Sequence, residues 1–138
     1  MKVFVDTSAL LALSNRADDL HPPARRIAAA LAPTARFVTT LPVLQESLTL
    51  VRRRVHHRRA TELGSAILTS SRYEVIYPGA EATAQALARC KRYADVPLSF
   101  TDCTSFVVMR ALGLTHAFAF DEHFHLFGFQ LCADETVG

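Results

Sequence analysis

The sequence predicts an α/β fold: a sandwich with a central, mostly parallel sheet of four to five strands flanked by helices. Short segments rich in Val, Ile, Phe and Tyr alternate along the chain with longer segments of helical periodicity, and such alternation is typical of a parallel sheet. Half of the residues are hydrophobic and a fifth are charged, so the chain is globular and not disordered. A length of 138 residues suits a single domain with a buried core over residues 1–138.

Local signals define the first five elements. Lys2–Asp6 is short, apolar and rich in strand-forming residues, as expected of a buried strand, and Ser8–Leu13 is expected to form a short helix. A turn with two prolines leads into a helix that reaches about Ala32, because proline is favoured in a first helical turn. Arg36–Thr40 is predicted as the second strand. Pro42–Val55 is predicted as a helix, since its apolar residues recur along one stripe.

The next elements continue the alternation. Ala60–Ser71 is expected to be helical, with a break from the preceding helix near His56 and His57. Tyr73–Ile76 is the third predicted strand. Ala80–Ala94 is an alanine-rich helix with a basic last turn, a placement of charge that the helix dipole favours.

The last third of the chain supplies the remaining elements. Thr101–Leu112 is apolar on every side, which indicates a buried helix, and Gly113 is a typical residue to end it. Thr115–Phe120 is predicted as the fourth strand and Glu122–Phe127 as a short helix. Phe129–Cys132 is the candidate for a last strand at the sheet edge.

Bulk properties narrow the class of protein. The net charge is only +2, and no apolar run is long enough to cross a membrane. The chain starts with a strand-like segment instead of a signal peptide, so we expect a cytoplasmic protein without a membrane partner. The three cysteines are too far apart for a zinc or disulfide-exchange motif and are interpreted as idle thiols.

Positive charge is concentrated in one segment, residues 52–59, which holds five arginines among eight positions. Two interpretations remain open. The segment is either a solvated helix end and turn, or a patch that contacts phosphate groups, since guanidinium groups bind phosphate oxygens through paired hydrogen bonds.

Four acidic residues in apolar contexts are the main functional signal. Asp6 and Asp121 follow predicted strands, Asp102 begins the apolar helix, and Glu46 lies inside a helix. Burying one carboxylate is costly, and carboxylates brought together repel one another and raise each other's pKa. A divalent cation with oxygen ligands removes that penalty. The sequence therefore predicts a metal site, and its oxygen-rich donors favour Mg²⁺ or Mn²⁺ over Zn²⁺.

Each acid also has a structural interpretation. Asp6 and Asp121 could cap the helices that follow them. Ser99 and Asp102 have the spacing of a capping box. Glu46 points away from the apolar stripe of its helix, so it is either an exposed helix residue or part of a face that lines the cleft.

The residues after Asp121 are given structural roles. Glu122 is interpreted as a first-turn helix acid, with a spare metal ligand as the alternative. His123 and His125 alternate in a context that does not suit a zinc site, and we expect them to cap a hydrophobic corner.

Three motifs, together with Glu46, resemble the PIN-domain family and, within it, the VapC-type toxins of bacterial toxin–antitoxin pairs. The motifs are Phe4–Leu10, Ser99–Asp102 and Phe118–Phe124, and the similarity covers roughly residues 1–131. The resemblance implies a PIN-like three-layer sandwich.

The resemblance also implies an activity and partners. PIN domains of the VapC type are Mg²⁺- or Mn²⁺-dependent endoribonucleases that cleave tRNA or rRNA. They are usually homodimers, and a cognate antitoxin neutralises them. By this resemblance we expect metal-assisted hydrolysis of RNA phosphodiester bonds.

The resemblance carries roles onto individual residues. The matching catalytic residues are Asp6, Glu46, Asp102 and Asp121. Asp6, Asp102 and Asp121 would hold metal, with Thr7, Ser8 and Thr101 as auxiliary residues. The expected RNA-binding residues are Arg52, Arg53, Arg58 and Arg59, with Arg16, Arg25 and Arg26 as further candidates.

The chain departs from the family pattern twice. Ala119 stands where related sequences often have a hydroxyl residue, and Phe100 adds an aromatic residue to the motif Ser99–Asp102. Neither change removes a carboxylate, so we expect an active enzyme.

A ribonuclease has rivals in other functional classes. A structure-specific DNA nuclease on the same fold and a catalytically silent binding protein remain as alternatives. A phosphatase with an aspartyl nucleophile would need a second acid two residues after Asp6, where Ser8 stands instead.

Overall fold

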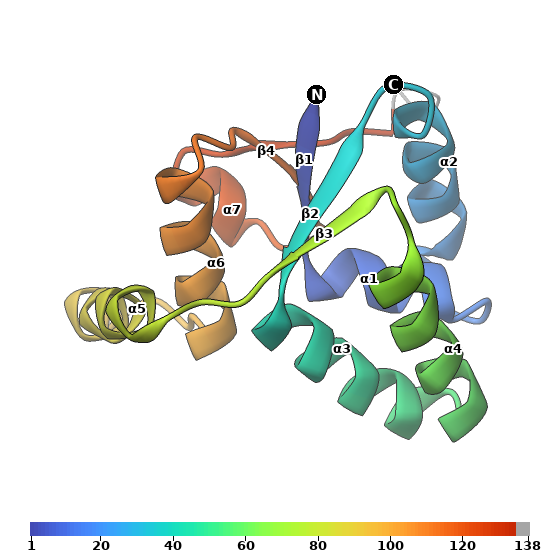
Figure 1. The fold of residues 1–138 in the computed structure, drawn as a ribbon, viewed down its shortest axis with the longest axis horizontal. Helices are drawn as coiled ribbons and strands as arrows, with labels where there is room; N and C mark the ends of the chain where they lie inside the picture. The colour runs from blue at the N-terminus through green and yellow to red at the C-terminus, as the bar shows by residue number, and fades with distance from the viewer. Residues whose placement is uncertain (135–138) are drawn as a thin grey trace.

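The computed structural model describes residues 1–134, and a five-stranded sheet with helices on both sides forms its centre (Figure 1). The strand order is β3-β2-β1-β4-β5, and every neighbouring pair is parallel. The strands are β1 (Lys2–Val5), β2 (Arg36–Thr40), β3 (Tyr73–Ile76), β4 (His116–Phe118) and β5 (Gln130–Leu131). The predicted α/β sandwich is confirmed, including the edge strand at its end.

Every expected helix is present, with ends that differ from the predicted ones by a few residues. The helices are α1 (Thr7–Ser14), α2 (His21–Leu31), α3 (Leu41–Arg54), α4 (His57–Thr69), α5 (Ala80–Arg92), α6 (Phe100–Ala111) and α7 (His123–Leu126). Gly113 and Gly128 follow α6 and α7 with φ of 69° and 92°, a backbone conformation that favours glycine.

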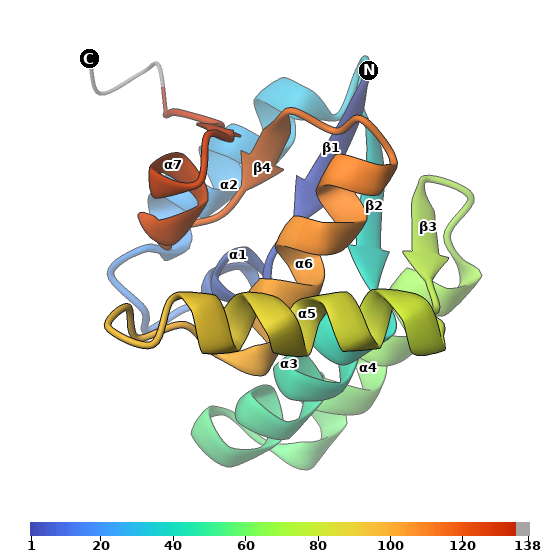
Figure 2. The ribbon, with the colours of Figure 1, turned by 90° about the vertical axis from the view of Figure 1, so that its left-hand side faces the viewer.

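Helix α6 is the buried centre of the helical layers. All its residues from Cys103 to Met109 are buried, as its uniformly apolar sequence predicts. It packs against the sheet on one side and against α5 on the other, and α5 crosses in front of it in Figure 2. The ring of Phe106 lies 5.0 Å from that of Phe124, and both side chains are fully buried. Burial of one such ring contributes about 2 kcal/mol, so Phe106 helps to anchor α6 in the core.

Strand β4 is shorter than predicted, and Asp121 therefore lies three residues beyond its end. The pairing of β4 with β1 stops at Val5 and Phe118 because Asp6 already begins the turn into α1. The chain after Phe118 bonds to the start of α1 instead, where the Phe120 N–H donates to Ser8 Oγ at 2.9 Å. This loop places Asp121 beside the first turn of α1.

The structure bears on two predictions, the state of the cysteines and the lack of a membrane-spanning segment. All three cysteines are free, and the Sγ atoms of Cys90 and Cys103 lie 2.8 Å apart between α5 and α6. Among the described helices, none has the length and apolar character to cross a membrane.

Candidate metal and active site

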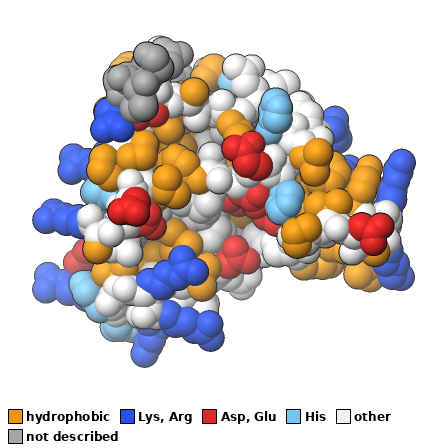
Figure 3. Space-filling view, turned by 180° about the vertical axis from the view of Figure 1, so that it is seen from behind, with side chains coloured by type: hydrophobic (Ala, Val, Ile, Leu, Met, Phe, Trp, Pro, Cys, Tyr) orange, Lys and Arg blue, Asp and Glu red, His pale blue; other side chains and the backbone are white. Residues whose placement is uncertain are grey.

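The four predicted acids meet at the carboxyl end of the sheet, and we call them the acidic cluster (Asp6, Glu46, Asp102 and Asp121). Asp6 follows β1, Asp121 lies in the loop after β4, and Asp102 and Glu46 are supplied by α6 and α3, which pack together. Charge on Asp102 acts on Asp6, and charges on Asp121 and Glu46 act on Asp102. Figure 3 shows acidic side chains gathered near the middle of one face.

Asp6 is both a helix cap and a buried acid. Its backbone is extended (φ −92°, ψ 162°), and its Oδ2 accepts hydrogen bonds from the Ser8 N–H at 3.1 Å and the Ser8 hydroxyl at 2.7 Å. Burial raises its pKa to about 6, against the lowering effect of the bonds from Ser8 and with a further rise from Asp102. The capping interpretation and the cluster interpretation therefore both hold.

Ser8 connects two parts of the site. Its Oγ donates to Asp6 and accepts from the Phe120 N–H, which ties α1 to the loop that carries Asp121. The neighbouring Thr7 hydroxyl is buried without a hydrogen-bond partner among residues 1–134. Thr101 lies half-buried in the first turn of α6.

Asp102 completes the predicted capping box. The Ser99 N–H donates to Asp102 Oδ2 at 3.1 Å, and the Asp102 N–H donates to Ser99 Oγ at 2.9 Å. Burial raises the pKa of Asp102, the bonds to Ser99 lower it, and the charges on Asp121 and Glu46 raise it further. The hydrogen bonds with Ser99 at the start of α6 thus hold Asp102 in place close to other carboxylates.

His123 lies beside two of the acids, a position that the sequence analysis did not predict. Ligand atoms of Asp102, Asp121 and His123 all lie within 4.8 Å of one another. The His123 N–H donates to Asp121 Oδ1 at 2.9 Å, and His123 Nδ1 lies 2.9 Å from the same oxygen. Phe124 is buried in the core, His125 is exposed, and His123 is partly buried beside Asp121. The tight turn after Asp121, which brings residue i+2 back to the acid, was the available signal.

The donor set fits a divalent cation. Burial and neighbouring carboxylates raise the pKa of Asp6 and of Asp102, so nearby positive charge would favour their ionised forms, and hard cations with oxygen ligands supply it. A histidine nitrogen beside two carboxylates is also compatible with Mn²⁺. Asp6 and Glu46 are not part of the group formed by Asp102, Asp121 and His123. Glu122 is exposed at the N-cap position of α7 without a capping bond, one residue before the first turn in which it was expected.

The two departures from the family pattern are accommodated. Ala119 is buried and brings no polar atom to the site, and the nearby Ser8 hydroxyl bonds the backbone of the next residue instead. The Phe100 side chain is 44% exposed at the first turn of α6, so it does not fill the space around the acids.

The arginine-rich segment is divided between two helices. Arg52 and Arg53 lie in the last turn of α3, and Arg52 Nη1 is 2.7 Å from His57 Nδ1. Arg58 and Arg59 begin α4 and line a cavity that Arg16 and Arg25 also line. Arg26, by contrast, pairs with Asp134 at 2.6 Å and lies outside that cavity.

The sequence as a whole matches known proteins. The model of the PIN domain family matches residues 3–130. Over 127 residues the chain is 39% identical to the 23S rRNA-specific endonuclease VapC20 of Mycobacterium tuberculosis (strain CDC 1551 / Oshkosh), which is 92% of this chain and 95% of VapC20. The VapC20 protein of M. tuberculosis strain ATCC 25618 / H37Rv matches to the same extent.

Solved structures agree with the sequence match. The crystal structure of M. tuberculosis VapC20, described as a sarcin–ricin loop cleaving toxin, superposes with a TM-score of 0.85 at 38% identity and covers 92% of this chain and 95% of its own. VapBC2 of Rickettsia felis, bound to a promoter DNA fragment, has a TM-score of 0.69 at 16% identity, with coverage of 95% and 97%. VapBC-1 of nontypeable Haemophilus influenzae has a TM-score of 0.65 at 14% identity, with coverage of 98% and 99%, and so supports the fold alone. On the family match and the identity to VapC20, this chain belongs to the PIN-domain family.

Proposed function

We propose that this chain is a divalent-metal-dependent endoribonuclease that cleaves 23S rRNA, and that it is the toxin of a type II toxin–antitoxin pair. The carrying observation is the acidic cluster, in which burial and neighbouring carboxylates raise the pKa of Asp6 and of Asp102, in a chain that is 39% identical to an rRNA endonuclease. Mg²⁺ or Mn²⁺ is the proposed ion, because carboxylate oxygens dominate the donor set.

The proposed mechanism assigns a role to each side chain. Asp102, Asp121 and His123 would hold the cation, and Asp6 would add negative charge beside them. A bound divalent cation supplies charge that lowers the pKa of water and stabilises the phosphate in the transition state. Glu46 has no hydrogen bond or ion pair from its side chain within the described residues, so its carboxylate is available to orient the attacking water. Ser8 positions Asp6 and the loop of Asp121.

Substrate and partners follow from the relatives. VapC20 is described as cleaving the sarcin–ricin loop, and the same loop is the proposed target here. The proposed protein partners are a cognate antitoxin and a second copy of the chain, and the proposed location is the cytoplasm, where ribosomal RNA is found. Arg52, Arg53, Arg58 and Arg59 are the proposed contacts to the RNA backbone.

Cleavage of bacterial ribosomes by the purified protein tests this proposal. The reaction is run with Mn²⁺, with Mg²⁺ and with EDTA, and the 23S rRNA ends are mapped by primer extension. We expect one metal-dependent cut with 3′-hydroxyl and 5′-phosphate ends, because water is the nucleophile. Products that carry a 2′,3′-cyclic phosphate contradict the mechanism.

Two variants make the test specific. Asp102→Asn keeps the capping geometry but removes a charge from the acidic cluster, and we expect no cleavage. Glu122→Gln is the matched control, because Glu122 is an exposed acid next to Asp121 that lies outside the cluster. Cleavage of DNA but not of rRNA favours the DNA nuclease, and a folded protein that cleaves neither favours the silent binding protein.

A further inference from the structure

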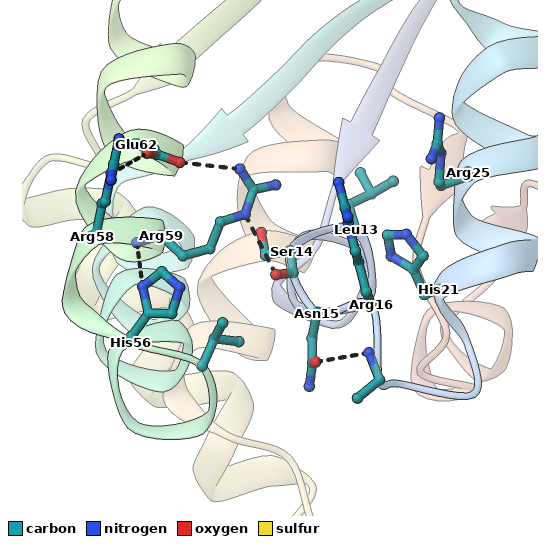
Figure 4. A pocket seen from close by; sticks show the side chains of 12 residues that line it. Leu13, Ser14, Asn15, Arg16, His21, Arg25, His56, Arg58, Arg59 and Glu62 are labelled. Atoms are coloured by element: carbon teal, nitrogen blue, oxygen red, sulfur yellow. Dashed lines mark hydrogen bonds and ion pairs between the residues drawn. The ribbon is translucent and has the colours of Figure 1, made fainter.

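The cavity lined by Arg58 and Arg59, which we call the basic pocket, lies between the end of α1, the start of α2 and the start of α4 (Figure 4). Its volume is about 880 Å³, and one acidic residue, Glu62, lines it. Its basic lining residues are Arg16, His21, Arg25, His56, Arg58 and Arg59. None of these side chains belongs to the acidic cluster.

Hydrogen bonds fix the walls of the basic pocket. His21 Nδ1 lies 2.7 Å from the Ala12 carbonyl oxygen and ties α2 to α1. His56 Nδ1 accepts from the Arg59 N–H at 3.0 Å and caps α4. Arg59 reaches across to α1, where its Nε donates to the Ser14 carbonyl at 3.4 Å. Three helices are therefore joined around one hollow.

The basic pocket carries more positive charge than Glu62, its one acidic residue, can neutralise. Glu62 pairs with Arg58 at 3.1 Å and with Arg59 at 3.7 Å. Arg16 and Arg25 are exposed and have no hydrogen bond or ion pair among residues 1–134. Guanidinium groups bind phosphate oxygens in bidentate fashion, so the unpaired arginines suit a phosphate.

An unsatisfied hydroxyl points to a ligand in the same place. Ser14 is only 5% exposed, and its Oγ has no hydrogen-bond partner within the described part of the chain. Figure 4 shows the Ser14 side chain at the wall beside the Arg59 guanidinium. A buried hydroxyl without a partner is unfavourable, and a phosphate oxygen would supply the missing bond.

The position of the basic pocket relates it to the acidic cluster. Asp6 caps the first turn of α1, and Ser14 ends the same helix. The eight residues of α1 span about 12 Å at a rise of about 1.5 Å per residue. Figure 3 shows basic side chains along the rim of the face on which the acids lie. Phosphate contacts at such a distance position a nucleic acid without reading its bases.

We propose that the basic pocket binds a backbone phosphate of the RNA substrate to one side of the scissile bond and thereby sets where the RNA lies across the acidic cluster. This inference rests on the proposed ribonuclease function and adds a defined phosphate site to it. Arg16, Arg25 and the Ser14 hydroxyl are the proposed ligands, and Glu62 neutralises part of the charge of Arg58 and Arg59.

Direct binding of inorganic phosphate tests the site without any RNA. The Asp102→Asn protein in EDTA is titrated with phosphate, and backbone amide shifts are followed by NMR. We expect shifts at Ser14, Arg58 and Arg59 that are lost in Arg16→Gln/Arg25→Gln and weakened about threefold by Ser14→Ala. The proposal is overturned if these amides do not shift with phosphate. It is also overturned if they shift with a poly-glutamate peptide and not with phosphate, which would assign the pocket to an acidic protein segment.

Cleavage kinetics separate this inference from the proposed function. In ribosome cleavage by the otherwise native enzyme, Arg16→Gln/Arg25→Gln should raise KM about tenfold, leave kcat within about twofold and flatten the dependence of KM on salt. Arg72→Gln/Lys91→Gln is the matched control, because it removes the same charge from exposed residues outside the pocket. Equal effects of the two double substitutions on KM, or an unchanged KM for Arg16→Gln/Arg25→Gln, overturn the phosphate site. Continued cleavage in that case still supports the proposed ribonuclease function. Phosphate binding by a protein that cleaves no RNA overturns both the function and the assignment of the pocket to RNA.

Discussion

The two ends of α1 carry sites of opposite charge, and the two sites are built differently. At the first turn, Asp6 is 4% exposed and its pKa is raised by burial and by a neighbouring acid. At the last turn, the basic pocket holds its charge on arginines at the surface, such as Arg58, whose side chain is 85% exposed. Like charges in the core destabilise the protein until a counterion arrives, whereas like charges in water repel only weakly. Stability and function therefore conflict at the acidic end and hardly at the basic end.

Removal of one acid should have the largest effect of any single change. Asp121→Asn should lower kcat/KM for rRNA cleavage roughly 10³-fold, because it removes a charge that acts on the reacting phosphate through the cation. The same variant should lose most of the rise in melting temperature that Mn²⁺ gives the native protein. Calorimetry with and without Mn²⁺, beside the cleavage assay, measures both. His125→Gln, an exposed histidine of the same segment, should retain full activity.

Asp6 should make the metal-free protein less stable as the pH rises. Its pKa is about 6 in the folded protein and 3.8 in an unfolded chain, so the folded state holds the extra proton between these values. The free energy of unfolding should then fall as pH increases from 4 to 6, by up to about 3 kcal/mol at pH 7. The amide of the Asp6→Asn variant does not ionise. Its free energy of unfolding should therefore equal that of the native protein at pH 4 and exceed it by the full difference at pH 7. Urea unfolding in EDTA at both pH values measures it, and a constant difference between the proteins would contradict the assignment.

The fold and the acids could be predicted because both depend on local sequence. Short β-rich segments and helical stripes define their elements without reference to distant residues. Asp6 and Asp102 stood out because each interrupts an apolar context that the core requires. The capping box of Asp102 was visible for the same reason, since its two partners are three residues apart.

The missed features depend on contacts between distant segments. The end of β4 is set by the turn after β1, so Ala119 and Phe120 could not be excluded from the strand on their own residues. His123 joins the acids only because the loop folds back on Asp121. The basic pocket combines the arginines that begin α4 with residues from α1 and α2, and no local pattern indicates that arrangement.

Ser8 should couple activity and stability at the acidic end. Ser8→Ala removes the hydroxyl that bonds both Asp6 and the Phe120 N–H. The unsatisfied groups should cost about 1–3 kcal/mol of unfolding free energy, and looser positioning should reduce kcat about tenfold. Chemical unfolding and ribosome cleavage provide the two measurements. Ser105→Ala is the control, because that hydroxyl bonds only to a carbonyl of its own helix, so loss of stability there should leave kcat unchanged.

The smallest effect should come from the one acid of the basic pocket, and it should have the opposite sign. Glu62→Gln releases Arg58 and Arg59 from their ion pairs, which are exposed and contribute about 0–1 kcal/mol to stability. The added positive charge should lower KM for rRNA about twofold at low salt and by less at high salt, because salt screens exposed charges. Glu74→Gln is the matched control, since Glu74 is half exposed and pairs with Lys2 at 3.6 Å away from the pocket. A higher KM in Glu62→Gln than in Glu74→Gln would show that Glu62 is needed to orient the arginines. Positive charge alone would then not explain how the basic pocket binds RNA.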